Sequence, residues 1–358
     1  MDRSLWVMII HAFVLAFAAL TGFAYLTLME RKVLARMQHR VGPNQAGPRG
    51  LFQPLADAVK LMFKEDIMPS AADKAVFTLA PILATVPAVV IFAVIPLGNN
   101  NLTIFGENIP LTFADINIGL LYLLAITSIG VYGITLGGWA SNNKYSMMGA
   151  VRSAAQMISY ELAFGLAVLV PVMLTAWRSV DGVGSLSLVD ITNAQAGTYL
   201  GFIPKWFVFT PTGWLAFFLF LIAATAEVTR APFDLVEAEQ ELVGGYATEY
   251  SSMKFALFFM AEYMKLIAMS ALAATLFLGG WRFPGLENIP GNWGALISFG
   301  VMVAKILFFL FLSIWVRASL PRIRYDKLMD FGWKRLLPIS LATMVATAVF
   351  VVLWAPLK

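Results

Sequence analysis

The sequence is poor in the residues that hold redox cofactors. It contains no cysteine and only two histidines, His11 and His39. This composition excludes disulfides, iron–sulfur ligation and a bis-histidine haem within the chain. If the protein takes part in redox chemistry, the cofactors are expected to belong to partner proteins.

Charged residues are also scarce. They make up 13% of the 358 residues, against 59% hydrophobic residues. This balance is too apolar for an ordinary soluble protein of that length. In lipid, backbone polar groups must be paired within their own segment, so each crossing needs roughly 20 apolar residues in helical form. The sequence therefore predicts an all-α integral membrane protein.

About eight apolar runs are long enough to cross a membrane as helices. They cover residues 5–29, 77–97, 119–140, 154–177, 206–226, 255–277, 293–316 and 336–354. We expect the first run to be a membrane helix and not a cleaved secretory signal, because it is too long and Glu30, Arg31 and Lys32 follow it. There is no internal repeat and no linker to a soluble domain, so residues 1–358 are expected to form a single polytopic membrane domain.

Lysine and arginine are concentrated in alternate loops. The segment 31–74 holds eight of them and the segment 317–335 holds six, whereas the segment 98–117 holds none. By the positive-inside rule, the two basic segments face the cytoplasm or the mitochondrial matrix, and both termini lie on the opposite side. The net charge of +4 comes from these loops and does not indicate nucleic-acid binding.

The first basic loop contains a predicted interfacial helix. A glycine and proline cluster at residues 42–50 breaks the preceding helix. After it, apolar residues recur at helical spacing, namely Leu51, Leu55, Ala58, Val59 and Met62. Charged residues occupy the other faces, which is typical of an amphipathic helix that lies on a membrane surface. Such a helix can roof a lateral opening to the membrane, and an ordinary surface connector is the alternative interpretation.

An acidic loop follows the fifth predicted span. It carries Glu227, Asp234, Glu237, Glu239, Glu241 and Glu249. On a helix that begins after Pro232, the residues Asp234, Glu237 and Glu241 would share one face. Like charges repel, so a stripe shielded from water would keep a proton on at least one carboxyl. Such a stripe suits proton exchange, whereas a solvated acidic loop is the alternative.

Ionisable residues also occur within predicted spans. They are Glu161, Glu262, Lys265 and Lys305. A charge at the centre of a membrane helix costs about 2.5–3.5 kcal/mol, so each should face the bundle interior or a water-filled cavity. Glu262 and Lys265 are spaced to pair on one helix face, where a structural ion pair and a proton site are equally compatible with the sequence. Glu161 has no close cation in its own helix, which favours proton binding.

Several strings carry a family resemblance. They are Glu30-Arg31-Lys32, Arg40-Val41-Gly42-Pro43-Asn44, Gln53-Pro54-Leu55-Ala56-Asp57, Phe63-Lys64-Glu65-Asp66, Ser159-Tyr160-Glu161, Arg230-Ala231-Pro232-Phe233-Asp234-Leu235, the segment 237–245, Thr248-Glu249-Tyr250-Ser251 and Arg322-Ile323-Arg324-Tyr325-Asp326. In their order and spacing, from the first span to the last, they resemble one family of membrane proteins. This is the family of the quinone-site membrane subunit, the H subunit, of proton-pumping NADH:quinone oxidoreductase, which is respiratory complex I.

The resemblance implies a membrane subunit at the junction of the membrane and peripheral arms. It implies that ubiquinone or menaquinone is the substrate and that the chain holds no cofactor of its own. NADH, FMN and the iron–sulfur clusters would bind to partner subunits. Those partners would include the peripheral-arm quinone-reducing and iron–sulfur subunits and the small membrane-arm subunits. The expected location is a bacterial inner membrane or a mitochondrial inner membrane, in contact with lipid.

The same resemblance directs attention to two groups of residues. Quinone pockets are mainly apolar with a few polar groups, and the expected quinone contacts are Arg36, Arg40, Phe52, Lys60, Lys64 and Phe233. The expected proton-coupling residues are Glu161, Glu227, Asp234, Glu237, Glu239, Glu241, Glu249 and Glu262. They would carry charge or proton rearrangement from the quinone cavity into the membrane arm.

Two other classes of protein fit parts of the pattern. A cation/proton antiporter would also need buried carboxylates and lysines, but we detect neither inverted halves nor a motif shared between them. The related subunit of membrane-bound hydrogenases could share the Pro-Phe-Asp and Glu-Ala-Glu features without using quinone. The proteins that purify with the chain would distinguish these two classes from the complex I family.

Overall fold

The structure is a computed structural model, and it describes residues 5–99, 102–104, 107–179, 182–199, 201, 203–234, 243–285, 289 and 291–354. The α-helices are α1 (Leu5–Met37), α2 (Gln53–Met62), α3 (Lys74–Val90), α4 (Gly119–Ala140), α5 (Lys144–Arg178), α6 (Leu188–Asn193), α7 (Pro211–Glu227), α9 (Ser252–Phe277), α10 (Gly291–Ser319), α11 (Tyr325–Phe331) and α12 (Leu337–Trp354). Short 3-10 turns are η1 (Pro48–Gly50), η2 (Ile91–Ala93), η3 (Phe207–Phe209) and η4 (Gly245–Ala247), and η5 (Gly332–Leu336) is a π-helical turn.

Strands are minor in the described part of the chain. β1 (Leu102–Ile104) pairs antiparallel with β2 (Glu107–Ile109), and β3 (Thr198–Tyr199) pairs antiparallel with β4 (Ile203–Pro204). Seven described helices are long and apolar enough to cross a membrane, and α7 is a shorter apolar helix at the place of the fifth predicted span. The predicted all-α, multi-pass membrane class is therefore confirmed, and α2 stands where the amphipathic helix was expected.

Several helix ends differ from the predicted ones because hydropathy registers apolar residues and not helical backbone. α1 continues past residue 29 to Met37, and α5 begins before residue 154, at Lys144. The side chain of Asn143 caps α5 by accepting the amide of Tyr145 at 3.0 Å. In the fifth span, α7 begins only at Pro211, which is a favoured residue in the first turn of a helix.

The second basic segment, residues 317–335, is mostly helical and not the loop that was expected. Arg317 belongs to α10, and α11 runs through the π-helical turn η5 into α12. Gly332 at the start of η5 lies against the ring of Tyr160, and a Cβ there would meet that ring at 3.3 Å. The turn thus brings the start of α12 close to α5.

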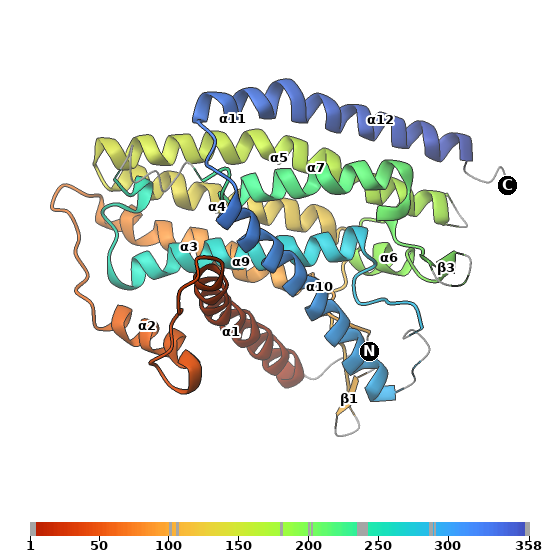
Figure 1. Cartoon of the computed structure of the whole chain (residues 1–358), viewed down its shortest axis with the longest axis horizontal. Coiled ribbons are helices and arrows are strands. Elements are labelled where there is room, and N and C mark those ends of the chain that lie inside the picture. The colour runs from red at the N-terminus through yellow and green to blue at the C-terminus, as the bar shows by residue number, and fades with distance from the viewer. Residues whose placement is uncertain are drawn as a thin grey trace.

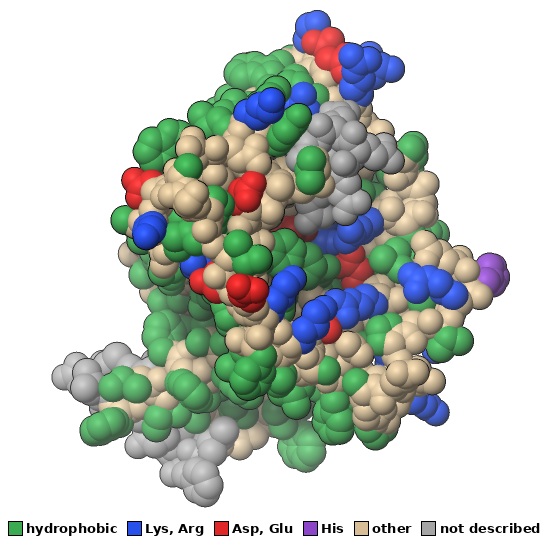
Figure 2. All heavy atoms as spheres, turned by 90° about the vertical axis from the view of Figure 1, so that its left-hand side faces the viewer, with side chains coloured by type: hydrophobic (Ala, Val, Ile, Leu, Met, Phe, Trp, Pro, Cys, Tyr) green, Lys and Arg blue, Asp and Glu red, His purple; other side chains and the backbone are tan. Residues whose placement is uncertain are grey.

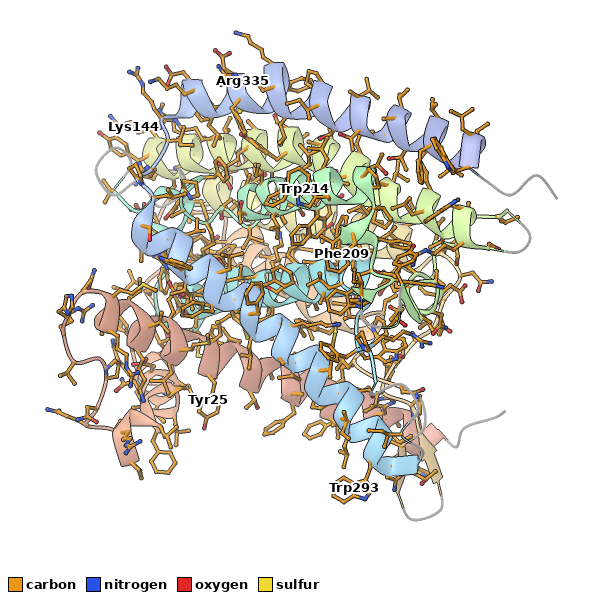
Figure 3. All side chains as sticks on the ribbon, turned by 45° about the vertical axis from the view of Figure 1, so that its right-hand side comes forward. Tyr25, Lys144, Phe209, Trp214, Trp293 and Arg335 are labelled. Carbon is orange, nitrogen blue, oxygen red and sulfur yellow. The ribbon has the colours of Figure 1, made fainter. Side chains whose placement is uncertain are left out.

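The helices run roughly alongside one another, while α1 and α10 cross the bundle obliquely (Figure 1). α2 and the loop that joins it to α3 lie on the left, whereas α1 begins and α12 ends towards the right. Figure 3 shows Lys144 and Arg335 on the left-hand side and Trp293 at the opposite end. Both basic segments thus lie at a different end of the bundle from the start of α1 and the end of α12.

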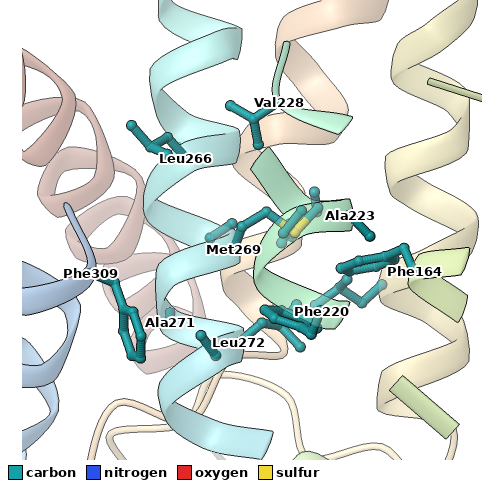
Figure 4. Packing of buried hydrophobic residues seen from close by; sticks show 14 of the residues in the cluster. Phe164, Phe220, Ala223, Val228, Leu266, Met269, Ala271, Leu272 and Phe309 are labelled. Carbon is teal, nitrogen blue, oxygen red and sulfur yellow. The ribbon is translucent and has the colours of Figure 1, made fainter. Parts of the chain in front are cut away.

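The core lies among α3, α4, α5, α7 and α9. Figure 4 shows its centre, where Phe164 of α5 packs against Phe220 of α7 with ring centroids 5.2 Å apart. Small residues bring other helices very close: a Cβ on Gly133 of α4 would come within 2.5 Å of the Ala84 amide nitrogen of α3. Close approach of this kind is typical of helix packing in membranes. It holds α4 tightly against α3.

Candidate functional site

Arg230 is the centre of a buried ion network. It lies in the turn after α7, and its side chain is 5% exposed. One guanidinium nitrogen, Nη1, donates to both carboxylate oxygens of Glu30 on α1, at 3.0 and 3.1 Å. Nε lies 2.6 Å from a carboxylate oxygen of Glu262 on α9, in an ion pair that is poorly aligned for a hydrogen bond. Arg230 therefore joins α1 and α9 at the end of α7.

Two further side chains complete this network. Arg317 of α10 pairs with Glu30, so the Glu30 carboxylate sits between two guanidinium groups. The guanidinium of Arg230 lies 4.1 Å from the ring centroid of Tyr263, which is a cation–π distance. Burial disfavours the charged form of Arg230, but neighbouring charges, above all Glu262, outweigh it and raise the pKa above its usual range. Arg230 is consequently a permanent cation.

A second charged group lies beside the first and extends across the bundle. Glu227 at the end of α7 and Lys265 of α9 are both buried. The charge of Lys265 interacts with those of Glu227, Glu262 and Glu161 of α5. On α4, the hydroxyl of Ser128 donates to the Glu161 carboxylate. Charges and polar groups thus continue from α7 and α9 to α5 and α4.

Gly130 of α4 makes room for the second group. A Cβ at this position would lie 2.9 Å from Nζ of Lys265 and 3.1 Å from its Cε. A cavity of about 20 Å³ adjoins the same place, lined by Gly130, Glu227, Glu262 and Lys265 among others. That volume suffices for one water molecule. Because side chains of both charged groups line this cavity, the two groups meet there.

The remaining acidic residues of the predicted coupling set lie at the edge of the site or outside the description. Glu249 accepts a hydrogen bond of 2.6 Å from the side-chain amide of Asn143, which caps α5. Asp234 is half-buried beside Phe233. Glu237, Glu239 and Glu241 lie outside the described residues, so the predicted acidic stripe stays a prediction.

Five of the six expected quinone contacts lie on the largely exposed stretch from the end of α1 to just past α2, residues 36–64, which we call the α1–α2 segment. They are Arg36, Arg40, Phe52, Lys60 and Lys64. Figure 2 shows this end of the molecule, where basic and acidic side chains gather around a hollow. Phe233 lies elsewhere: it is 6% exposed and packs against Tyr160 with ring centroids 5.8 Å apart. Its place is in the interior, directly after the turn that holds Arg230.

Two apolar cavities flank α10. One, of about 300 Å³, lies between α7, α9 and α10, and Phe233 is among the residues that line it. The other, of about 430 Å³, lies between α1, α9 and α10 and is lined by Leu15, Tyr25 and Phe299 among others. Both have the size and apolar walls of a site for a hydrophobic molecule. Within the described ranges, no group of three or more His, Cys or acidic side chains could hold a metal ion.

Lys305 of α10 lies apart from both charged groups, beside the turn between α9 and α10. Its ammonium donates to the carbonyls of Leu278 and Gly280 at 2.7 Å and to that of Arg282 at 2.8 Å. It also lies 4.5 Å from the ring centroid of Trp206. The last carbonyls of a helix lack partners within the helix and favour a cation. Lys305 supplies that cation at the end of α9.

Sequence reasoning included Glu161, Glu227 and Glu262, but it missed the network around Arg230. Glu30 and Arg317 were assigned to loops, and both belong to helices. Helical phase was the available signal, because Glu30 follows the buried Leu26 by one turn on the same face of α1.

Fold and site together define a class of protein: a polytopic membrane protein with a chain of buried charges that spans several helices. The NADH dehydrogenase family profile matches residues 10–348. The chain belongs to this family.

Relatives of similar length support the assignment. The H subunit of the NADH-quinone oxidoreductase of Deinococcus deserti is 52% identical over 350 residues, which cover 97% of this chain and 84% of the relative. The H subunit of Thermomicrobium roseum is also 52% identical, over 96% of this chain and 95% of the relative. The first H subunit of Geobacter metallireducens is 50% identical, over 92% of each chain.

Proposed function

We propose that the chain is the membrane subunit of a proton-pumping NADH:quinone oxidoreductase at the junction with the peripheral arm. The names of its relatives support this assignment, since the match extends over nearly the whole chain. Its partners would be the quinone-reducing and iron–sulfur subunits of the peripheral arm and the small membrane-arm subunits. NADH, FMN and the clusters would bind to partners, in keeping with a sequence that contains no cysteine.

The basic end of the molecule would face the cytoplasm. The α1–α2 segment carries many of the lysines and arginines, and it lies opposite the chain ends (Figure 1). The relatives described above are bacterial, which favours a bacterial cell membrane over a mitochondrial one. The peripheral arm would then dock against this basic end.

Quinone would reach the complex along the surface that α1, α2 and α10 form. The apolar cavities beside α10 suit the tail, and the exposed basic groups of the α1–α2 segment suit the polar head group. The head group would be reduced by electrons from a partner's cluster. This chain would contribute walls of the tunnel and no electrons.

Coupling would run through the buried charges, and this arrangement is the observation that carries the proposal. Quinone reduction takes up protons and so changes the charge near the inner end of the bundle. The Arg230 network lies at that end and borders the cavity that Glu227 and Lys265 share. A change of charge there alters the field on Glu227, then on Lys265 and Glu161, because close charges in a poorly solvated site interact strongly.

The test replaces two carboxylates of this charged chain, the buried Glu227 and the half-buried Glu161, in the intact complex. Glu227→Gln and Glu161→Gln keep the shape of the side chain but remove its titration. We expect NADH oxidation by artificial acceptors to stay intact, while quinone reduction and proton pumping fall together. Asp330→Asn is the matched control, because Asp330 is exposed and pairs only with Lys334 one turn away among the described ion pairs. Unaltered pumping in both glutamine variants would show that the buried charges are structural.

The acidic loop needs a separate test, because it lies largely outside the described residues. Glu237→Gln, Glu241→Gln and Asp234→Asn are expected to assemble and to lose quinone reduction and pumping in parallel. A solvated loop would tolerate all of them. Variants that pump at the unmodified rate would support that alternative.

The quinone contact is tested by a photoreactive quinone analogue in the intact complex. We expect labelling within the α1–α2 segment. Labelling confined to the outer-face loops, or no labelling of this chain, would contradict the proposed tunnel.

A further inference from the structure

The interfacial helix α2 is not held in place by apolar packing. None of its residues is buried. Its apolar side chains face outwards, with Leu55 and Met62 each 64% exposed and Phe63, just after the helix, 86% exposed. Burial is the usual source of stability for a helix of this length. Within the described part of this chain, the contacts that fix the position of α2 are therefore polar.

These contacts come from two helices, α1 and α9. On the α1 side, Arg31 pairs with Asp57 at 2.5 Å, and the ammonium of Lys32 donates to the Arg49 carbonyl at 2.5 Å. Glu30, the residue before Arg31, points the other way and binds Arg230. The same stretch of α1 thus holds α2 on one side and the buried network on the other.

The second set of contacts comes from the start of α9. The hydroxyl of Ser252 donates to the Leu61 carbonyl in the last turn of α2, at 2.9 Å. The hydroxyl of Ser251 accepts the Ile67 amide at 2.8 Å and donates to the Glu65 carbonyl at 3.1 Å. Each serine therefore satisfies backbone groups that α2 and the segment after it leave without helical partners.

An ion pair reinforces the same junction. Lys254, in the first turn of α9, lies 2.8 Å from the carboxylate of Asp66. Asp66 is 48% exposed, so this pair is weaker than the hydrogen bonds to the backbone. The α9 helix that begins here carries Glu262 and Lys265 further along. The position of α2 is consequently tied to both helices that grip Arg230.

We propose that Ser251 and Ser252 are positioning residues that hold α2 over the quinone opening, and that they determine the apparent affinity for long-tailed quinones. This inference rests on the proposed function. A loose α2 leaves the opening without a fixed wall, which weakens contacts to the tail but leaves the chemistry of the head group unchanged. Loosening α2 should therefore raise the KM for a long-tailed quinone and leave kcat unchanged.

The experiment uses the intact complex with the double variant Ser251→Ala and Ser252→Ala. The double variant removes three hydrogen bonds. We expect the KM for a decyl-tailed quinone to rise about fivefold or more, because the loss of even one such bond predicts a change of about that size. The KM for a tail-free quinone and the kcat for both substrates should stay unchanged. The single variant Ser251→Thr keeps a hydroxyl at this position and should keep the KM of the unmodified complex. Thr78→Ala is the control, because its hydroxyl bonds only within α3, to the Lys74 carbonyl.

Hydrogen exchange provides a second measurement in the same preparations. Amides of residues 53–67 should exchange faster in the double variant, because the Ile67 amide loses its acceptor. If the double variant does not assemble, Asp66→Asn removes the exposed contact alone and should show the same effects in smaller measure. Unchanged exchange, or an unchanged KM for the long-tailed quinone while the photoreactive analogue still labels the α1–α2 segment, overturns the proposal. Failure of that labelling in the unmodified complex would instead overturn the proposed function.

Discussion

Replacing Arg230 by methionine tests the buried network most directly. The side chain is 5% exposed and holds carboxylates on two helices, Glu30 and Glu262. Removing one partner of a buried ion pair costs about 3–5 kcal/mol, because the remaining charge loses its compensation. Glu30 keeps Arg317 in the variant. Glu262 keeps its electrostatic interaction with Lys265, so the loss should lie towards the lower end of this range.

A second substitution should recover much of this loss. Arg230→Met combined with Glu262→Met removes both charges, and apolar replacement of a buried pair is often close to neutral. The double variant should then be clearly more stable than the sum of the two single effects predicts. Lys334→Met is the control, because Lys334 pairs with Asp330 at 2.8 Å with side chains that are 73% and 65% exposed. Such a pair contributes about 0–1 kcal/mol.

Large membrane complexes unfold irreversibly, so the measurement is a rate. The complex in mild detergent would be heated for increasing times, and the surviving fraction read from a native gel stained for NADH oxidation. Arg230→Met should lose complex much faster than Lys334→Met. The reasoning is refuted if the two decay alike, or if the double variant of Arg230 and Glu262 decays as fast as additivity predicts.

Two further predictions concern single positions on α4 and α10. Gly130→Ala should displace the Lys265 ammonium and lower proton pumping with little loss of assembly. Gly165→Ala is the control, because a Cβ there meets nothing within 4 Å and should be neutral or slightly stabilising. Equal pumping in the two variants would contradict this prediction. Lys305→Met leaves three partly buried carbonyls without their donor and should shorten the lifetime of the heated complex, since an unsatisfied buried group costs about 1–3 kcal/mol. The exposed Lys327→Met serves as its control, and indistinguishable lifetimes would show that the carbonyls find other donors.

The fold was predictable from sequence to the extent that it follows apolar length. Eight runs predicted the spans, and the amphipathic pattern after residue 50 predicted α2. Helix ends were less accessible, because Lys144 and Arg317 belong to helices that continue beyond their apolar parts. A hydropathy pattern contains no information on where a polar helix stops.

The candidate site was predictable only where a charge stands inside an apolar run. Glu161 and Glu262 were found in this way. Arg230 was missed because it lies in a turn, and turns normally place arginine in water. Tertiary contacts with Glu30 of α1 and with Glu262 and Tyr263 of α9 bury it. Such pairing depends on how the helices cross, which local patterns do not specify.

Lys305 places a charge that is costly in lipid within a membrane helix, and every hydrogen-bond donor of its ammonium has an acceptor. The ammonium group donates to three backbone carbonyls at the turn between α9 and α10. Transfer of a proton from Lys305 would break a hydrogen bond that holds the end of α9 to α10. Each transfer would therefore require the turn to open and then re-form. A side chain that relays protons should be able to gain and lose one without breaking the hydrogen bonds that hold the fold together. Lys305 instead links α10 to the end of α9, so we expect the proton-transferring groups of this chain to be its carboxylates.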